Sequence, residues 1–198
     1  DLEHTLFTRV RRRFPEATPA HRLGRGTSGI VLFAFTACAR SALGEAMRGR
    51  RVVKIYRALA SGIPNQDDFS IERAIGPVAH PLLGTVHASS PTGKHAVSHA
   101  RVLERRENAS LLEVRIETGR PHQIRIHLAA AGHPLVGDPL YAAGGGFKEP
   151  QTSLPGDCGY FLLAERVCLD HPTTGSPLDV WCSPPPMLRR TVVSACSR

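Results

Sequence analysis

The stretch T-G-R-P-H-Q-I-R-I-H-L-A-A-A-G-H-P-L-V-G-D-P-L-Y, residues 118–141, decides the fold of this chain. It follows residues 111–117, where apolar and charged side chains alternate as in a strand with one buried face. Gly119 permits a turn that a residue with a Cβ atom would resist, and Pro121 suits the first turn of a helix. The pattern therefore predicts a strand, a tight turn and a helix in that order. The buried face of the strand is predicted to carry Leu112, Val114 and Ile116.

The helix after this turn is marked by an apolar stripe at Ile124, Leu128 and Ala131, which recur at i, i+4 and i+7. Gly132 can cap its C-terminal end. Arg125 lies about 100° around the helix from the stripe residue before it, so we expect its side chain to face a cleft.

Donors and cations gather in this helix and in the turn before it. Such groups suit the recognition of a phosphate or a nucleotide edge. The alternative is the solvated polar face of an ordinary surface helix. The side chains concerned are Arg120, His122, Gln123, Arg125 and His127.

Composition narrows the class of protein. The 198 residues suffice for one sizeable core, and 25 Lys and Arg against 17 Asp and Glu leave a formal charge of +8. That charge favours a polyanionic partner, nucleic acid before an anionic membrane surface. No apolar run approaches the roughly 20 residues of a membrane span, and the opening D-L-E-H is unlike a signal peptide. We expect a soluble intracellular protein, cytoplasmic or organellar.

The cysteines agree with this compartment. They are odd in number, widely spread and without a C-x-x-C pair, which indicates free thiols in a reducing environment. They are Cys38, Cys158, Cys168, Cys182 and Cys196.

Periodicity predicts the remaining elements. Residues 1–14 have the pattern of an arginine-rich amphipathic helix, and the apolar run 30–35 is short enough for a buried strand. Residues 37–48 are expected to form a helix closed by Gly49, and residues 52–60 a strand. Further predictions are a turn at 61–66, a strand at 95–104, a flexible loop from Gly144 to about Gly159 and a closing strand at 161–169.

Gly24, Gly26 and Gly29 satisfy the G-x-G-x-x-G pattern of dinucleotide binding. That fingerprint requires a strand before the glycines and a helix after them. Here a polar loop precedes them and an apolar, β-prone run follows. A dinucleotide-binding oxidoreductase is therefore rejected.

Two blocks of motifs carry a family resemblance. H-R-L-G-R-G-T-S-G-I, residues 21–30, together with T-G-R-x-H-Q-I-R-x-H and G-H-P-L-V-G-D-P-L-Y, resembles the RluA family of pseudouridine synthases. The family pattern H-R-L-D-x-x-T-S-G-[LIV] is matched except where Gly24 replaces the family's catalytic aspartate. K-x-Y with Tyr56 resembles the family's second active-site motif, an ordinary strand tyrosine being the alternative.

The fold class follows from the spacing of the elements and from the resemblance. Short strands with few helices and no regular βαβ spacing indicate an α+β fold with a mixed, mostly antiparallel sheet. The resemblance implies a few flanking helices and a central cleft. Residues 1–186 are expected to form one pseudouridine synthase-like catalytic domain, with 187–198 a flexible tail. We expect this domain to be N-terminally truncated, because the family's first strand and K-P-x-G loop are absent.

The resemblance implies that the chain isomerises uridine to pseudouridine in rRNA or tRNA, as a monomer without metal, cofactor or membrane. The position of Gly24, with Tyr56 and Arg125, is expected to form the catalytic site. The other possibility is a catalytically inactive RNA-binding protein on the same fold, because Gly24 removes the central carboxylate. Asp138 could substitute, although a short acidic residue beside Gly and Pro more often braces a turn. Expected RNA contacts are His21, Arg22, Arg25, Thr27, Ser28, Arg120, His122 and Gln123.

Overall fold

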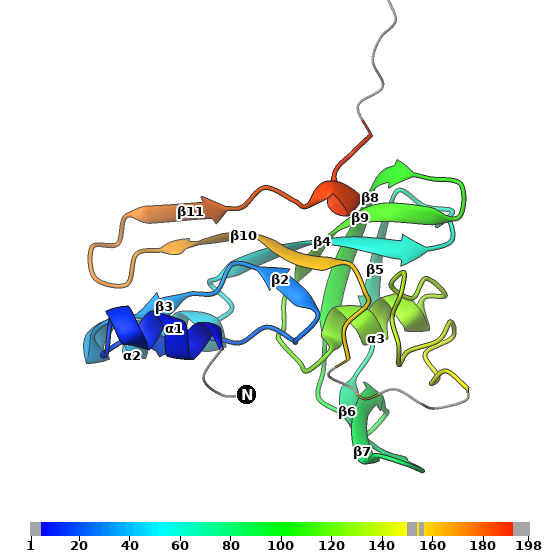
Figure 1. Ribbon diagram of the computed structural model, residues 1–198, viewed down its shortest axis with the longest axis horizontal. Coiled ribbons are helices and arrows are strands. Elements are labelled where there is room, and N and C mark those ends of the chain that lie inside the picture. Colours follow the sequence, from blue (N-terminus) through cyan, green and yellow to red (C-terminus); the bar gives the residue numbers. More distant parts are fainter. Residues whose placement is uncertain (1–4, 150–153, 155–156, 192–198) are drawn as a thin grey trace, which may run out of the picture.

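A mostly antiparallel sheet forms the body of the protein in the computed structural model, which describes residues 5–149, 154 and 157–191 (Figure 1). Six strands follow the order β11-β10-β4-β9-β8-β5, and β2 pairs with β10 in parallel. Together with three α-helices, this confirms the predicted α+β class. The strands of the sheet are β2 (Thr27–Gly29), β4 (Val53–Ser61), β5 (Asp68–Glu72), β8 (Val97–Arg105), β9 (Ala109–Ile116), β10 (Leu162–Asp170) and β11 (Pro177–Trp181).

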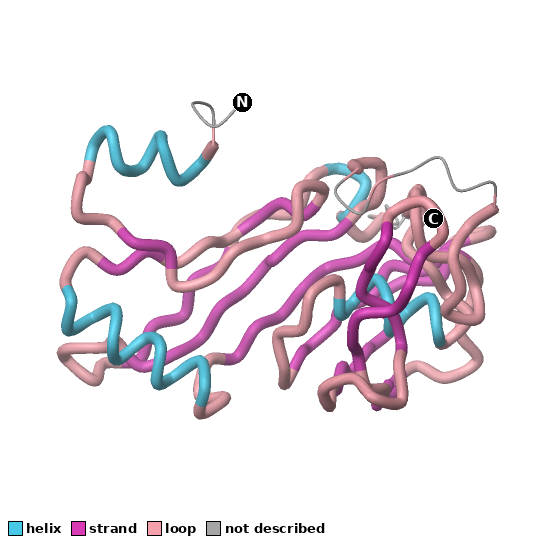
Figure 2. The backbone as a smooth tube through the Cα atoms, turned by 90° about the horizontal axis from the view of Figure 1, so that it is seen from below, coloured by secondary structure: helices cyan, strands magenta, loops and turns pink. Residues whose placement is uncertain are grey.

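Two small sheets and two groups of helices surround this body. Figure 2 shows helices α1 (Leu6–Arg13) and α2 (Ala37–Arg48) at one end of the sheet and the hairpin of β6 (Ile75–His80) and β7 (Gly84–Ser89) away from them. The other small sheet joins β1 (Thr18–Pro19) to β3 (Phe33–Ala34). Helix α3 (Gln123–Ala130) lies near the end of the main sheet that contains β8 and β5 (Figure 1).

Strand β9 lies between β4 and β8 and confirms the predicted alternation. Its residues Leu112, Val114 and Ile116 are buried. They share one core cluster with Ile124 and Leu128 of α3. Apolar side chains on one face of the strand and one stripe of the helix thus position α3 against the sheet.

The entry into α3 differs from the prediction in two respects. Gly119 is not among the residues with positive φ, and Pro121 lies before the helix, not in its first turn. The left-handed position is His122, the N-cap, with φ of 54°. At the other end Gly132 does adopt a positive φ of 89°, while Ala131 is exposed and does not extend the apolar stripe.

The predicted strand at 30–35 is wrong except for its last residues, which form β3. The backbone before it, β2, ends at Gly29 with φ of 110°, where an added Cβ atom would stand 2.3 Å from the carbonyl oxygen of Ala164. The chain turns there and leaves the sheet. Ile30 and Leu32 instead pack against the cluster that contains Leu43 of α2, so their apolar character serves side-chain packing and not a strand ladder.

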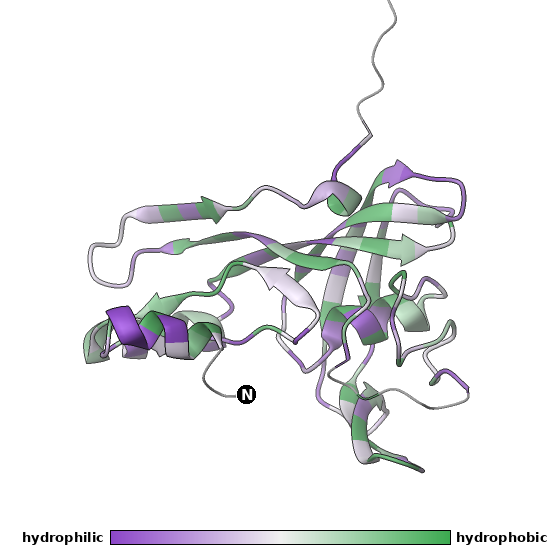
Figure 3. Ribbon diagram, viewed as in Figure 1, coloured by the Kyte–Doolittle hydropathy of each residue, from purple (hydrophilic) through white to green (hydrophobic). Residues whose placement is uncertain are grey.

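The other predicted elements agree with the structure within a few residues. Helix α2 has the predicted bounds, β4 matches the prediction at 52–60, β8 that at 95–104 and β10 that at 161–169. Helix α1 also forms, although it buries no side chain, and residues 1–4 lie outside the described residues. Figure 3 shows α1 as one of the more hydrophilic elements.

The end of the described chain is more ordered than predicted. A short 3-10 helix, Pro186–Leu188, places Leu188 in a cluster with Leu59, Leu111 and Leu163, where only 1% of it is exposed. Arg106 donates hydrogen bonds to the carbonyl oxygens of Met187 and Arg189. The prediction of a flexible tail from 187 is therefore wrong for the described part, and residues 192–198 lie outside it.

The glycine-rich segment after Tyr141 also begins as packed structure. The N–H of Gly144 donates to the carbonyl oxygen of Ala129, and Tyr141 forms a β-bridge with Phe147. The predicted flexible loop is therefore wrong for residues 144–149, and its residues 150–153, 155 and 156 lie outside the described part. No helix in the described part is long and apolar enough to cross a bilayer. Free thiols are found, as predicted, at Cys38, Cys158, Cys168 and Cys182, and Cys196 lies outside the described residues.

Candidate functional site

Tyr160, which precedes β10, is the side chain around which the motif positions meet. Its hydroxyl oxygen lies 3.2 Å from the place a Cβ atom of Gly24 would take. Its ring centroid lies 4.4 Å from Cζ of Arg125. Tyr56 belongs to the same buried apolar cluster as Tyr160. Gly24 and Arg125, far apart in the sequence, are thus both neighbours of one aromatic ring, and Tyr56 lies in the same apolar cluster.

Arg125 is not open to a cleft, contrary to the prediction, because only 2% of it is exposed. Its Nε and Nη2 donate hydrogen bonds of 2.7 and 2.9 Å to the two carboxylate oxygens of Asp138. Its guanidinium also lies close to two aromatic rings, with Cζ 4.4 Å from the centroid of Tyr160 and 4.9 Å from that of Tyr141. Two rings and a bidentate partner hold this cation in one orientation.

Asp138 pairs with Arg125 and braces a turn at the same time. Its Oδ1 accepts hydrogen bonds from the backbone N–H groups of Leu140 and Tyr141 at 2.9 and 3.0 Å. Burial alone would raise the pKa of Asp138, but the hydrogen bonds and charge of Arg125 lower it below its usual value. For Arg125, burial alone would lower the pKa, but Asp138 raises it. The two groups therefore form a buried ion pair in which both are charged.

His122 holds a strained backbone position beside this pair. Its φ of 54° is unusual for a residue other than glycine, and its Nδ1 hydrogen-bonds the hydroxyl of Tyr141 at 2.8 Å. Burial, followed by the nearby charge of Arg125, lowers the pKa of His122 from 6.5 to about 4. The imidazole is therefore neutral near pH 7, and such strain often marks functional positions.

Gln123 does not fit its expected role in RNA contact. Only 3% of it is exposed. Its Oε1 accepts from the Thr118 hydroxyl and the Arg120 N–H, and its Nε2 donates to the Val97 carbonyl and the Ser98 hydroxyl. All four hydrogen-bonding positions of the amide are used inside the protein. Gln123 therefore joins α3 to the start of β8 as a structural brace.

His127 has a similar place. It is fully buried, with Nδ1 hydrogen-bonded to the Ser98 hydroxyl at 2.9 Å and Nε2 to the Arg73 carbonyl oxygen at 3.0 Å. It thus ties α3 to β8 and to the segment after β5. The polar residues of this helix are therefore mainly internal, and the alternative of a solvated polar face does not hold for them.

The loop of residues 21–29 supplies exposed groups on the side of Gly24. Arg22 and Arg25 are exposed, as is Ser28, whose hydroxyl makes one long hydrogen bond of 3.4 Å to Leu162. His21 is different, because its Nε2 accepts a hydrogen bond from the Leu32 N–H at 3.2 Å. Burial, followed by the charge of Lys54, lowers the pKa of His21. His21 therefore supports the loop as a neutral side chain.

Strand β4 contributes Lys54 and Tyr56 to the same region. Lys54 Nζ lies 3.4 Å from the place a Cβ atom of Gly119 would take, and burial lowers the pKa of Lys54. Burial also raises the pKa of Tyr56 to about 12, so its phenol stays protonated. Arg120, next to Gly119, is half-buried and donates from Nε to the His95 carbonyl oxygen at 3.1 Å. Two cations thus border the turn that leads into α3.

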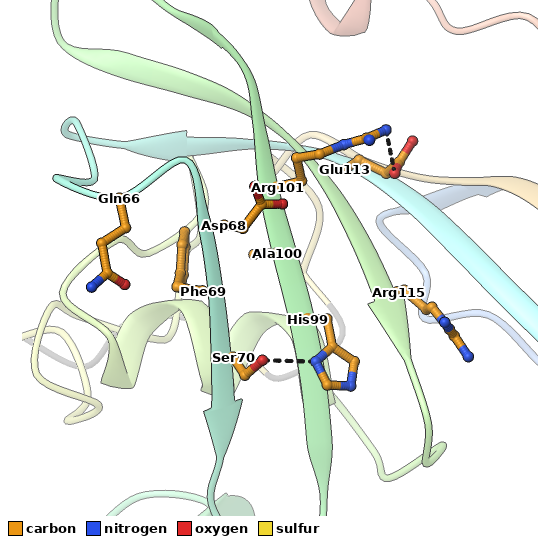
Figure 4. A pocket seen from close by; sticks show the side chains of 9 residues that line it. All are labelled: Gln66, Asp68, Phe69, Ser70, His99, Ala100, Arg101, Glu113 and Arg115. Atoms are coloured by element: carbon orange, nitrogen blue, oxygen red, sulfur yellow. Dashed lines mark hydrogen bonds and ion pairs between the residues drawn. The ribbon is translucent and has the colours of Figure 1, made fainter.

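A groove lies apart from these residues, on β5, β8 and β9 (Figure 4). Four of the polar side chains that line it are joined in two pairs. The hydroxyl of Ser70 hydrogen-bonds His99 at 2.8 Å, and Arg101 donates to Glu113 at 2.9 Å. We therefore place the candidate site at Tyr160 and not in this groove. Within the described residues, no cluster of His, Cys, Asp or Glu has the make-up of a metal site.

Two residues of the site were not found from the sequence. Tyr160 lies outside every quoted motif, and no spacing signal connects it to residues 21–29. Tyr141 ends the quoted stretch, but nothing in the pattern indicated that its ring would cover Arg125. Both are recognisable only as aromatic side chains whose neighbours are decided by the fold.

The comparisons with known proteins agree on one family. The family model described as RNA pseudouridylate synthase matches residues 9–130. RNA pseudouridine synthase 5 of Arabidopsis thaliana is 44% identical over 200 residues, covering 81% of this chain and 54% of the relative. An uncharacterized RNA pseudouridine synthase of Synechocystis is 38% identical over 187 residues, covering 93% and 64%. The chain thus spans between half and two thirds of the length of these relatives.

The fold has a similar counterpart among solved structures. Human RNA Pseudouridylate Synthase Domain Containing 1 superposes with a TM-score of 0.74 at 27% sequence identity. The match covers 96% of this chain and 78% of the human chain. The described sheet and helices therefore have the arrangement of that domain.

Proposed function

The chain belongs to the RNA pseudouridylate synthase family, and from this premise we propose that it isomerises uridine to pseudouridine within rRNA or tRNA. In this reaction the base leaves its ribose, turns, and is rejoined through carbon, so that no atom is gained or lost. The chain acts as a monomer without metal or cofactor in this proposal. The catalytic domain extends to Leu188, because that residue completes a core cluster.

One observation supports this proposal most directly. The two motif blocks meet at Tyr160, whose hydroxyl oxygen lies close to Gly24 and whose ring lies close to the guanidinium of Arg125. A surface patch that bound RNA only through its phosphates would need no buried and oriented guanidinium. Arg125, held by Asp138, suits a site where a base is positioned for a reaction.

The target nucleotide has to leave its stack before it can reach this site. Extruding a base costs a few kcal/mol, and stacking on an aromatic side chain such as Tyr56 returns ~1–3 kcal/mol. The exposed face of the site lies at Gly24, since Tyr56 and Arg125 are buried. We therefore propose that the base enters beside Gly24.

We assign the contacts with the flanking RNA to the cationic side chains around this entrance. Arg22 and Arg25 are exposed on the loop that contains Gly24. Arg120 borders the turn before α3, and His122 lies beside Arg125. Phosphate contacts by such side chains position RNA without reading its sequence. Thr27 and Ser28 add hydroxyl groups on the same loop.

The chemistry at position 24 is the distinctive feature of this chain. A glycine offers no acid, base or nucleophile, and Asp138 is already paired with Arg125. Loss of one positioned acid or base costs ~10²–10⁴ in rate. We therefore propose a slow synthase that retains the binding site of the family.

The test is to incubate the unaltered chain with transcribed rRNA and with tRNA, digest the RNA to nucleosides and separate pseudouridine from uridine by chromatography. We expect pseudouridine above the level formed without protein, and RNA binding that weakens as salt rises. RNA binding without pseudouridine would identify an RNA-binding protein instead. Absence of both would overturn the proposal. Sedimentation of the chain without RNA tests whether it is a monomer.

A further inference from the structure

The two tyrosines that stack on Arg125 differ in their hydroxyl groups. The hydroxyl of Tyr141 donates to the His87 carbonyl oxygen at 2.7 Å and bonds His122 Nδ1 at 2.8 Å. Among the described residues, the hydroxyl of Tyr160 has a single hydrogen bond, with Thr27 Oγ1 at 3.4 Å, although only 6% of Tyr160 is exposed. A buried hydroxyl with one long bond has unused hydrogen-bonding capacity.

The ring of Tyr160 is fixed in place by its packing. A Cβ atom on Gly26 would stand 2.7 and 2.8 Å from Cζ and Cε1 of this ring, closer than side chains approach. Cζ of Arg125 lies 4.4 Å from the centroid of the same ring. The hydroxyl is therefore held in one position and does not have to be ordered when a ligand arrives.

That hydroxyl points into the space beside Gly24. Among the described residues, and apart from its two neighbours in the sequence, a Cβ atom there would meet two atoms within 4 Å, the Tyr160 hydroxyl oxygen at 3.2 Å and Thr27 Oγ1 at 3.5 Å. Two hydroxyl oxygens thus border a space that is otherwise open and lies at the exposed entrance of the site. A ligand group placed there would meet two partners that each donate and accept hydrogen bonds.

A sugar hydroxyl matches such a pair. Among the groups of a uridine nucleotide, only the sugar hydroxyls both donate and accept at a single atom. The 2′-hydroxyl is also the group by which proteins distinguish RNA from DNA. We propose that the hydroxyls of Tyr160 and Thr27 bind the ribose 2′-hydroxyl of the target uridine in the space beside Gly24. This inference rests on the proposed function, because that function supplies the uridine.

The test combines a protein change with a change in the RNA. Tyr160→Phe removes the hydroxyl and keeps the ring that contacts Gly26 and Arg125. The RNA probes are a fluorescent single-stranded RNA with one uridine among adenosines, and the same RNA with 2′-deoxyuridine at that position. We expect the deoxy change to weaken binding to the unaltered chain by roughly threefold to tenfold, the range of one net hydrogen bond. In Tyr160→Phe the two probes should bind within about twofold of each other.

Tyr141→Phe is the matched control, because Tyr141 stacks on the same guanidinium and its hydroxyl is satisfied inside the protein. It should keep the full difference between the two probes. Thr27→Val, which keeps the shape of Thr27, should reduce the difference in part and serves as the second variant if Tyr160→Phe unfolds. Thermal unfolding of each variant establishes that it is folded. If the Tyr160 hydroxyl had a purely structural role, its removal would not change the ratio of the affinities for the two probes.

The outcomes separate this inference from the proposed function. If the unaltered chain binds RNA and forms pseudouridine, but the deoxy change has the same effect in Tyr160→Phe as in the unaltered chain, the inference is wrong and the function stands. The same holds if the deoxy change has no effect on the unaltered chain. If the unaltered chain neither binds the probes nor forms pseudouridine, both the inference and the proposed function are wrong.

Discussion

Restoring a carboxylate at position 24 tests the site most directly. Gly24 is not among the residues with positive φ, so Gly24→Asp requires no strained backbone. Its Cβ atom would lie 3.2 Å from the Tyr160 hydroxyl and 3.5 Å from Thr27 Oγ1, which needs a shift of a few tenths of an ångström at most. A carboxylate there can accept hydrogen bonds from both hydroxyls. The Arg125 guanidinium behind the Tyr160 ring favours its charged form.

The stability of this variant follows from opposing contributions. Replacing glycine at a compatible position stabilises by ~0.4–1 kcal/mol, because the unfolded chain loses freedom. Hydrogen bonds to a charged group contribute ~1.5–3 kcal/mol. Bringing the carboxylate out of water offsets much of this gain, although Gly24 is exposed. We expect the free energy of unfolding of Gly24→Asp, measured with urea, to stay within about 1 kcal/mol of the unaltered chain.

The effect on activity is expected to be much larger than the effect on stability. One positioned acid or base contributes ~10²–10⁴ in rate, so Gly24→Asp should form pseudouridine at least ~10²-fold faster. Gly24→Asn is the matched control, since it has the same shape without the charge. Equal rates for these two variants would refute the reasoning. Equal rates for the unaltered chain and Gly24→Asp, well above background, would show that another residue carries the chemistry.

Three further predictions follow from the charges of the site. Arg22→Ala and Arg120→Ala should each reduce the slope of log binding constant against log salt concentration by roughly 0.7–0.9 per lost phosphate contact. Unchanged slopes in RNA titrations would contradict the assignment of these two arginines to phosphates. Asp138→Asn should lower the free energy of unfolding by about 3–5 kcal/mol, because Arg125 remains as a buried charge without its partner; a loss below about 1 kcal/mol in urea unfolding would count against this pair. The pKa of His122 is lowered from 6.5 to about 4 in the folded protein. As the pH falls from 6.5 towards 4, the unfolded chain therefore takes up a proton at His122 before the folded protein does, and the free energy of unfolding decreases. His122→Asn, which tolerates the left-handed backbone, should reduce the fall in melting temperature between about pH 7 and pH 5, and an unreduced fall would place the acid sensitivity elsewhere.

The three helices and the strands β4, β8, β9 and β10 could be predicted from the sequence, because their causes are local, whereas β1, β2, β5, β6, β7 and β11 were not predicted. The alternation around Val114 and the apolar stripe of α3 have periods of two and 3.6 residues, and each follows from backbone geometry alone. The prediction of a strand at 30–35 was wrong for the same reason, because it used local pattern alone. Its apolar residues resemble a strand locally, but β2 has already paired with β10 and the chain has turned at Gly29.

The site was predictable only as a set of motif positions. The motifs identified Gly24, Tyr56 and Arg125. The structure places Gly24 and Arg125 close to the side chain of Tyr160, and Tyr56 in the same apolar cluster. The partner of Arg125 was not evident from the sequence. It is Asp138, because the turn after α3 returns the chain to the buried face of the helix.

What the sequence by itself determined is therefore the helices and the long strands, the family motifs and the glycine where a carboxylate was expected. Only the tertiary structure decided which side chains meet there. The hydroxyl of Tyr160 reaches Thr27 across 133 residues of sequence. No period or motif connects positions so far apart, because their contact depends on how β2 pairs with β10 and on how the ring then packs over Gly26.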